Sequence, residues 1–313
     1  MAVTIHPEML SIIEQWECSE LARMLTLRPE EVQAMVASLE SPPWHIEMAE
    51  IRDLVIPSTE REIPARLYHP DPGTDVPLVV WFHGGGWVLG TLDLADSVAT
   101  FLAHEANVAV LSVDYRLAPQ HPFPAAADDC LAAAAWAMTH PDQLGIDASR
   151  VAIGGDSAGG NLAAVVTQDL HRNGNTPPVA AQFLVYPITD HDPDRPSMIE
   201  FAEGYILSRD IMNWFHEQYA PNPADREAVR YSPIKAEDLS GLPPAVVLLA
   251  EADVLHDEGL AYGQRLQDAG VPTEMHVATG MIHGFIGNWM ISPNAEAEFR
   301  TAIQHLSRFL HSD

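Results

Sequence analysis

Short apolar runs alternate with longer segments of helical character along most of this chain. Eight runs have strand character, and the segments between them carry apolar residues at helical spacing. The runs are residues 51–55, 62–68, 76–82, 108–113, 151–153, 180–185, 245–249 and 273–277. Because most of these runs are nearly unbroken, they suit strands that are buried on both faces. The pattern therefore predicts an α/β fold whose sheet is mostly parallel and covered by helices on both sides.

The segments between the runs fit crossover helices. We expect these at residues 125–138, 158–171, 257–269 and 296–310, and further helices at 7–20 and from Arg28 onward. Residues 190–232 break the rhythm, because they hold four prolines and a helical piece at 210–219. We expect N-terminal cap helices at 1–45, a core formed by 46–189 and 233–313, and a cap insertion at 190–232. Such a cap would cover the carboxyl edge of the sheet, where open α/β sheets bind ligands.

Composition narrows the classes of function. The 313 residues include 16 Lys and Arg against 44 Asp and Glu, a net charge of -28. Such a surface repels phosphate backbones and anionic lipids, which argues against nucleic-acid binding and electrostatic membrane anchoring. Two cysteines do not make a disulfide framework. Residues 1–15 lack a signal-peptide pattern, and the longest apolar run, 131–138, is too short to cross a bilayer. These features predict a cytoplasmic protein.

A serine in the sequence G-D-S-A-G at residues 155–159 is the candidate nucleophile. The pentapeptide follows a predicted strand and opens a predicted helix, which is the context that a G-x-S-x-G nucleophile requires. Glycines on both sides let the chain turn sharply. Ser157 would then stand at a helix N-terminus, where a developing negative charge is stabilised.

The sequence H-G-G-G at residues 83–86 predicts an oxyanion hole. It follows the run 76–82 directly, and residues without side chains can turn their backbone N–H groups into a cavity. We expect Gly84, Gly85 and Ala158 to supply the donors. His83 is expected to anchor the loop and not to act as a base.

A nucleophilic serine needs a base and an orienting carboxylate, which in one hydrolase fold follow it in the order Ser, Asp, His. Asp253 stands at the carboxyl end of a predicted strand, and His283 lies in the loop after the last one. Asp257 is the rival carboxylate, expected to cap the next helix, and His276 is the rival base, expected inside a strand. No H-E-x-x-H spacing and no phosphate-binding loop is present, so neither a metal nor a nucleotide cofactor is implied.

These motifs resemble the hormone-sensitive lipase family of α/β-hydrolases, the bacterial family IV esterases. The matching segments are 83–87, 115–119, 121–125, 154–161, 253 with 257–259, and 283–285. The resemblance implies the α/β-hydrolase fold, with an eight-stranded sheet and a helical cap, and a serine carboxylesterase that needs no cofactor and sometimes forms homodimers. It further implies short- to medium-chain acyl esters as substrates. Gln120, Val254 and His256 depart from the family pattern, and Val254 could alter the turn that presents Asp253.

The expected reaction is ester hydrolysis through an acyl-enzyme on Ser157, with His283 as base and Asp253 orienting it. Five apolar or aromatic residues are expected to line the substrate pocket: Trp87, Tyr205, Leu207, Trp214 and Phe285. An amidase or deacetylase using the same triad stays open, because the sequence does not separate amides from esters. A non-catalytic ligand receptor or a lyase on this fold is disfavoured, because the serine, the histidine and the glycines are all present.

Overall fold

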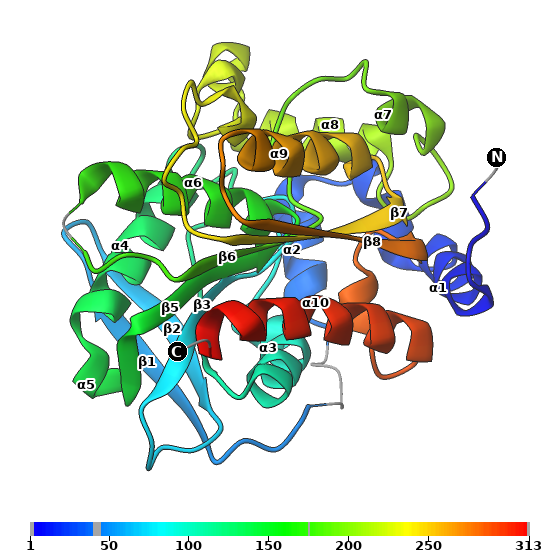
Figure 1. Ribbon diagram of the computed structural model, residues 1–313. Coiled ribbons are helices and arrows are strands. Elements are labelled where there is room, and N and C mark those ends of the chain that lie inside the picture. Colours follow the sequence, from blue (N-terminus) through cyan, green and yellow to red (C-terminus); the bar gives the residue numbers. More distant parts are fainter. Residues whose placement is uncertain (1–2, 40–44, 175, 312–313) are drawn as a thin grey trace.

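An eight-stranded sheet runs through the described part of the computed structural model, which comprises residues 3–39, 45–174 and 176–311 (Figure 1). Its order is β1-β2-β4-β3-β5-β6-β7-β8. β2 is antiparallel to both of its neighbours, β1 and β4, and all other neighbouring pairs are parallel. The mostly parallel sheet predicted from the sequence is thereby confirmed. The strands are β1 (Glu50–Pro57), β2 (Glu62–His69), β3 (Val76–Phe82), β4 (Ala109–Val113), β5 (Ile146–Asp156), β6 (Ala181–Val185), β7 (Ala245–Ala252) and β8 (Thr273–Ile282).

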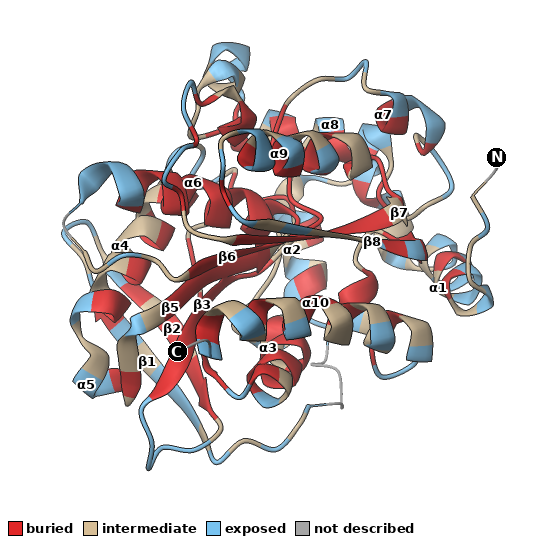
Figure 2. Cartoon of the chain, viewed as in Figure 1, coloured by how far each residue is buried: buried red, intermediate tan, exposed pale blue. Residues whose placement is uncertain are grey.

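Helices cover both faces of the sheet, as predicted (Figure 1). One face carries α3 (Leu92–Ala106) and α10 (Pro293–His311), and the other carries α4 (Ala125–Thr139), α6 (Ala158–Asn173) and α9 (His256–Asp268), with the short α5 (Pro141–Leu144) beside β5. Every residue of β3, β4 and β6 is buried between these layers, which Figure 2 shows as a continuous core. Among the described residues, the helices are too short or too polar to cross a membrane.

The helix α3 was not predicted from the sequence pattern. Nine of its residues are buried, because it packs against both the sheet and the neighbouring helix α10, so its apolar positions do not form a single stripe. Its ends do carry local signals. The Thr91 hydroxyl accepts the Leu94 N–H at 3.2 Å, and Asn107 closes the helix with a φ of 52°.

The N-terminal segment and the segment after β6 are in contact with each other. The 3₁₀ helix η1 (Glu20–Thr26) packs against α8 (Arg209–Tyr219). The predicted helix 7–20 ends early because Ser19 starts a new turn, with its hydroxyl accepting the Ala22 N–H. The remaining elements are α1 (Pro7–Glu17), α2 (Pro29–Ala37), α7 (Pro196–Glu200), η2 (Pro223–Glu227), η3 (Pro233–Lys235) and η4 (Phe285–Asn288). Residues 1–2 and 40–44 of the predicted N-terminal cap lie outside the described residues.

Candidate active site

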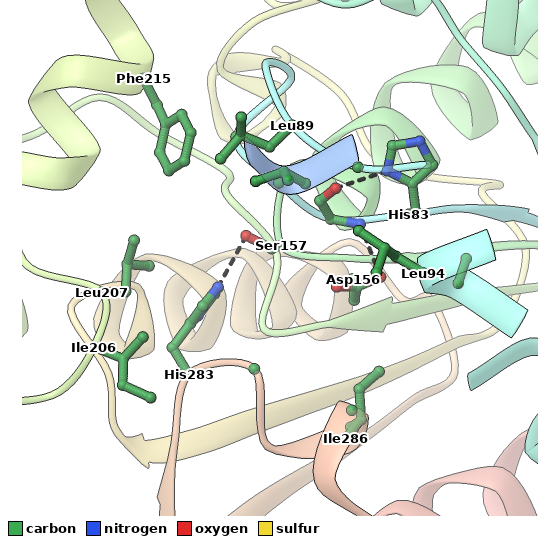
Figure 3. A pocket seen from close by; sticks show the side chains of 18 of the residues that line it. His83, Leu89, Leu94, Asp156, Ser157, Ile206, Leu207, Phe215, His283 and Ile286 are labelled. Atoms are coloured by element: carbon green, nitrogen blue, oxygen red, sulfur yellow. Dashed lines mark hydrogen bonds between the residues drawn. The ribbon is translucent and has the colours of Figure 1, made fainter. Parts of the chain in front are cut away.

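Ser157 forms the sharp turn between β5 and α6. Its φ of 56° and ψ of -118° are uncommon for a residue with a side chain, and backbone strain of this kind is concentrated at functional sites. The turn requires close packing of the backbone on both sides. A Cβ at Gly155 would overlap the Gly159 carbonyl, and a Cβ at Gly159 would overlap the Phe82 carbonyl oxygen. The sequence around the serine is therefore what allows its hydroxyl to reach a cavity at the N-terminus of α6 (Figure 3).

His283 links the serine to a buried carboxylate. Its Nε2 lies 2.9 Å from Ser157 Oγ, a contact drawn as a dashed line in Figure 3, and its Nδ1 lies 2.7 Å from Asp253 Oδ2. Asp253 follows β7 and His283 follows β8, so two neighbouring parallel strands bring them to the same edge of the sheet. The second Asp253 oxygen accepts the Leu255 N–H at 3.0 Å, which fixes the carboxylate. The departure from the family pattern at Val254 leaves this geometry intact.

The rival residues lie elsewhere. Asp257 is in the first turn of α9, but its carboxylate accepts the Ser197 N–H from α7 at 2.8 Å and does not cap its own helix. His276 lies on β8, as expected, and is bonded to Glu298 of α10. His83 Nδ1–H donates to the Gly84 carbonyl at 2.7 Å, and burial lowers the pKa of the His83 imidazole. Within the described ranges, no three His, Cys, Asp or Glu side chains are grouped to hold a metal ion.

The oxyanion loop differs from expectation at Gly84. Its N–H donates to Asp156 Oδ1 at 3.0 Å and is therefore not available to a substrate. The expectation that Gly84 supplies an oxyanion donor is thus corrected. The N–H groups of Gly85, Gly86 and Ala158 have no hydrogen-bond partner among the described residues. Gly85 and Gly86 have φ values of 112° and 60°, which residues with side chains rarely adopt. The donor set that fits the geometry is thus Gly85, Gly86 and Ala158.

A cavity of about 380 Å³ opens at Ser157. Three parts of the chain form it: the N-terminal segment, the stretch 206–215, and the core around Ser157 and His283. The N-terminal residues Trp16, Leu21, Met24, Val36 and Leu39 were missed by the sequence analysis, as were Leu94, Ala95 and Val98 of α3. No Lys or Arg is among the described residues that line it. The cavity therefore suits a neutral, apolar substrate.

Of the five predicted pocket residues, Leu207 lines this cavity and the other four do not. Trp87 is fully buried and stacks on Tyr219 of α8, with ring centroids 4.5 Å apart. Phe285 is buried against Tyr186. Tyr205 and Trp214 pack edge-on against Phe201 and Phe215. These rings support the residues around the cavity, because large aromatic groups near a site often serve in packing.

Glu258 fixes the connection from β6 to the segment 190–232. Its carboxylate is buried and accepts the N–H groups of Thr189 and Asp190 at 2.7 and 3.3 Å. Burial raises the pKa of Glu258 from 4.5 to about 8. Since the folded protein then holds a proton that the unfolded chain releases near 4.5, this group stabilises the fold at low pH. That contribution is lost as the pH rises toward 8.

We therefore expect the free energy of unfolding of the wild type to fall between pH 5 and 8 relative to Glu258→Gln. The difference should reach up to about 1.4 kcal/mol per pH unit, since one proton is involved. Gln keeps an acceptor for the two N–H groups but does not titrate, so the other acids cancel in the comparison. Urea unfolding of both proteins at several pH values measures the difference, and two parallel curves would contradict a raised pKa for Glu258.

Comparisons with known proteins show the family to which this chain belongs. Residues 79–287 match a family model described as alpha/beta hydrolase fold. The carboxylic ester hydrolase LipN of Mycobacterium tuberculosis is 41% identical over 88% of this chain and 75% of its own length. The carboxylesterase NlhH of the same species is 40% identical over 90% of each chain. Ethyl acetate hydrolase of Pseudomonas putida is 39% identical over 79% of each.

Solved structures of esterases also superpose closely on this chain. The ester hydrolase EH1AB1 from the metagenome of Lake Arreo superposes with a TM-score of 0.90 at 36% identity, covering 99% of this chain and 100% of its own. A thermostable esterase from Pseudomonas putida ECU1011 superposes with a TM-score of 0.91 at 30% identity over 100% of both. The chain belongs to the alpha/beta hydrolase family, within its hormone-sensitive-lipase-like branch of carboxylic ester hydrolases.

Proposed function

We propose that this serine carboxylesterase acts on short- to medium-chain acyl esters, with Ser157, His283 and Asp253 as its triad. The observation that carries the proposal is the continuous hydrogen-bonded path from Ser157 Oγ through His283 to Asp253, which opens into an apolar cavity. In the resting enzyme the serine hydroxyl donates to His283 Nε2, while Nδ1–H donates to the Asp253 carboxylate. Asp253 thus fixes the tautomer that can accept a proton.

The reaction proceeds in two halves. His283 takes the proton of Ser157 as its oxygen attacks the ester carbonyl, and the N–H groups of Gly85, Gly86 and Ala158 stabilise the oxyanion. Each donor is worth on the order of 3 kcal/mol of barrier. His283 then protonates the leaving alcohol. In the second half it takes a proton from the water that attacks the acyl carbon, and it returns this proton to Ser157 as the carboxylic acid is released. The nucleophile, the base and the oxyanion donors of this reaction all belong to this chain.

The N-terminal helices and the segment 190–232 form the proposed cap, and its inner surface sets substrate size. The cavity is lined by residues of α3 and η4 and, from the segment 190–232, by Ile206, Leu207, Ile211, Met212 and Phe215. If an acyl chain is longer than this cavity, part of its apolar surface stays exposed to water and contributes nothing to binding. The cytoplasmic location and the homodimer implied by the sequence and the family resemblance stay predictions.

Hydrolysis of p-nitrophenyl esters from acetate to palmitate tests this substrate class. We expect kcat/KM to peak at short or medium chains. Replacing Leu207 with tryptophan fills part of the cavity and should lower kcat/KM for the octanoate at least about tenfold relative to the acetate, since a few buried methylene groups are worth this much. Tyr205→Trp is the matched control, because Tyr205 does not line the cavity. A peak at palmitate, or an equal effect of both variants, would contradict the proposal.

The amidase alternative is tested with the same protein. Paired assays of p-nitrophenyl acetate and p-nitroacetanilide compare an ester and an amide with the same acyl group. We expect the ester to be hydrolysed and the anilide to react far more slowly. Faster hydrolysis of the anilide would assign the triad to amide bonds.

A further inference from the structure

The carboxylate of Asp156 lies between the nucleophile turn and the oxyanion loop (Figure 3). Asp156 precedes Ser157 at the end of β5, and the loop follows β3, the neighbouring strand in the sheet. The Gly84 N–H donates to Asp156 Oδ1, and the fit is so close that a Cβ on Gly84 would overlap Asp156 Oδ2. This hydrogen bond therefore joins the residue next to the nucleophile to the first glycine of the loop.

The other side of Gly84 is held as firmly. His83 Nδ1–H donates to the Gly84 carbonyl at 2.7 Å, and the Tyr115 hydroxyl donates to the His83 carbonyl at 2.7 Å (Figure 3 shows the first contact). The His83 and Tyr115 rings are stacked, with centroids 4.4 Å apart. Both peptide groups around Gly84 are thus bonded, whereas the N–H groups of Gly85 and Gly86 are without partners among the described residues.

An acid at this position is unfavourable in two respects. Burial raises the pKa of Asp156 to about 6, because a carboxylate is poorly solvated there. A negative charge close to the oxyanion hole also opposes the charge that develops in the transition state. A charge-assisted hydrogen bond to Gly84 is a compensating gain, because such bonds are shorter and stronger than neutral ones. Burial of a carboxyl group in an active site is itself a sign of function.

Given the esterase function proposed above, we propose that Asp156 is a positioning residue for the oxyanion hole. By accepting the Gly84 N–H, its carboxylate sets the distance between the nucleophile and the loop, so that the Gly85 and Gly86 N–H groups face the oxyanion. Asp156 acts through Gly84 and does not contact the substrate's reacting atoms. Asp156 should therefore stabilise the transition state and contribute little to substrate binding, so its loss should lower kcat and leave KM nearly unchanged.

Three variants separate this role from a general structural one. Asp156→Ala removes the acceptor, Asp156→Ser leaves a hydroxyl too short to reach Gly84, and Asp156→Asn keeps an acceptor oxygen without the charge. Asp169→Ala is the control for loss of a buried carboxylate, because Asp169 lies on α6 and is bonded to Arg172 and Arg230, away from the loop. The readouts are kcat and KM for p-nitrophenyl butyrate, with thermal unfolding and near-UV circular dichroism to establish folding.

We expect Asp156→Ala to lower kcat about 10- to 100-fold with KM within about threefold of the wild type, the effect of a small misplacement of catalytic groups. Asp156→Asn should restore kcat to within about fivefold, and Asp169→Ala should lower thermal stability without lowering kcat. If the alanine variant does not fold, the serine variant replaces it in the comparison.

Three results would overturn the proposal: an unchanged kcat in the folded alanine or serine variant, an equal loss in the asparagine variant, or a change confined to KM. A wild-type enzyme without esterase activity would instead overturn the proposed function, so the two failures are distinguishable.

Discussion

Replacing Ser157 with alanine is expected to lower kcat for p-nitrophenyl butyrate by about 10⁶-fold, or about 8 kcal/mol of transition-state stabilisation. The alanine side chain has no oxygen to form the acyl-enzyme, and His283 loses the group whose proton it accepts at 2.9 Å. Residual hydrolysis would come from the oxyanion donors and from binding alone. Because alanine has a Cβ as serine does, the strained turn itself is retained. Steady-state hydrolysis at high enzyme concentration measures the loss.

Ser112→Ala is the matched control for this variant. Ser112 is buried on β4, and its hydroxyl has no hydrogen-bond partner among the described residues, so its removal should leave kcat unchanged. Both variants should unfold at temperatures close to that of the wild type. If folded Ser157→Ala keeps more than about one hundredth of wild-type activity, another nucleophile carries the reaction.

Replacing Asp253 with asparagine is the second large effect, and we expect kcat to fall by about 10⁴-fold. In the wild type, Asp253 Oδ2 accepts the His283 Nδ1–H at 2.7 Å. The asparagine amide would instead donate a hydrogen bond to Nδ1. The imidazole would then hold its proton on Nε2 and could not accept one from Ser157. The loss should therefore lie mainly in kcat, because the cavity walls are unchanged.

Asp257→Asn tests the specificity of this assignment. Both carboxylates lie after β7, but Asp257 accepts the Ser197 N–H and not a histidine N–H. An asparagine oxygen can accept the same bond, so kcat should stay within about threefold of the wild type. Equal losses in the Asp253 and Asp257 variants would contradict the assignment of Asp253 to the triad.

Much of this fold could be predicted because its strands are buried on both faces. The run 76–82 coincides with β3, where every residue is buried. In contrast, β5 extends well beyond the predicted run 151–153, because polar residues at 147, 149 and 150 interrupt its apolar pattern. The helix α3 was missed for the opposite reason, since burial on most of its circumference removes the helical stripe. Strand order was not predicted, because local patterns carry no record of which strands pair.

The three residues of the proposed triad could be named from the sequence because each follows a strand in a fixed chain order, and the structure brings their side chains into hydrogen-bonding distance. The errors concern contacts between distant segments. The bond from Gly84 to Asp156 spans 72 residues, and no local signal marks it. The cavity wall formed by Leu21 and Met24 likewise depends on how η1 packs against α8. An aromatic residue beside a motif, such as Trp87, was a poor guide to the pocket, because its ring packs on Tyr219 of α8.

Covalent labelling of the nucleophile tests the central claim most directly. The wild type would be inactivated with a p-nitrophenyl alkylphosphonate, which mimics the tetrahedral intermediate, and the modified residue would be located by peptide mass mapping. We predict one adduct per chain on Ser157, formed in proportion to the loss of esterase activity and absent from Ser157→Ala. Inactivation through an adduct on another residue, or full activity with Ser157 modified, would contradict the assignment of Ser157 as the nucleophile.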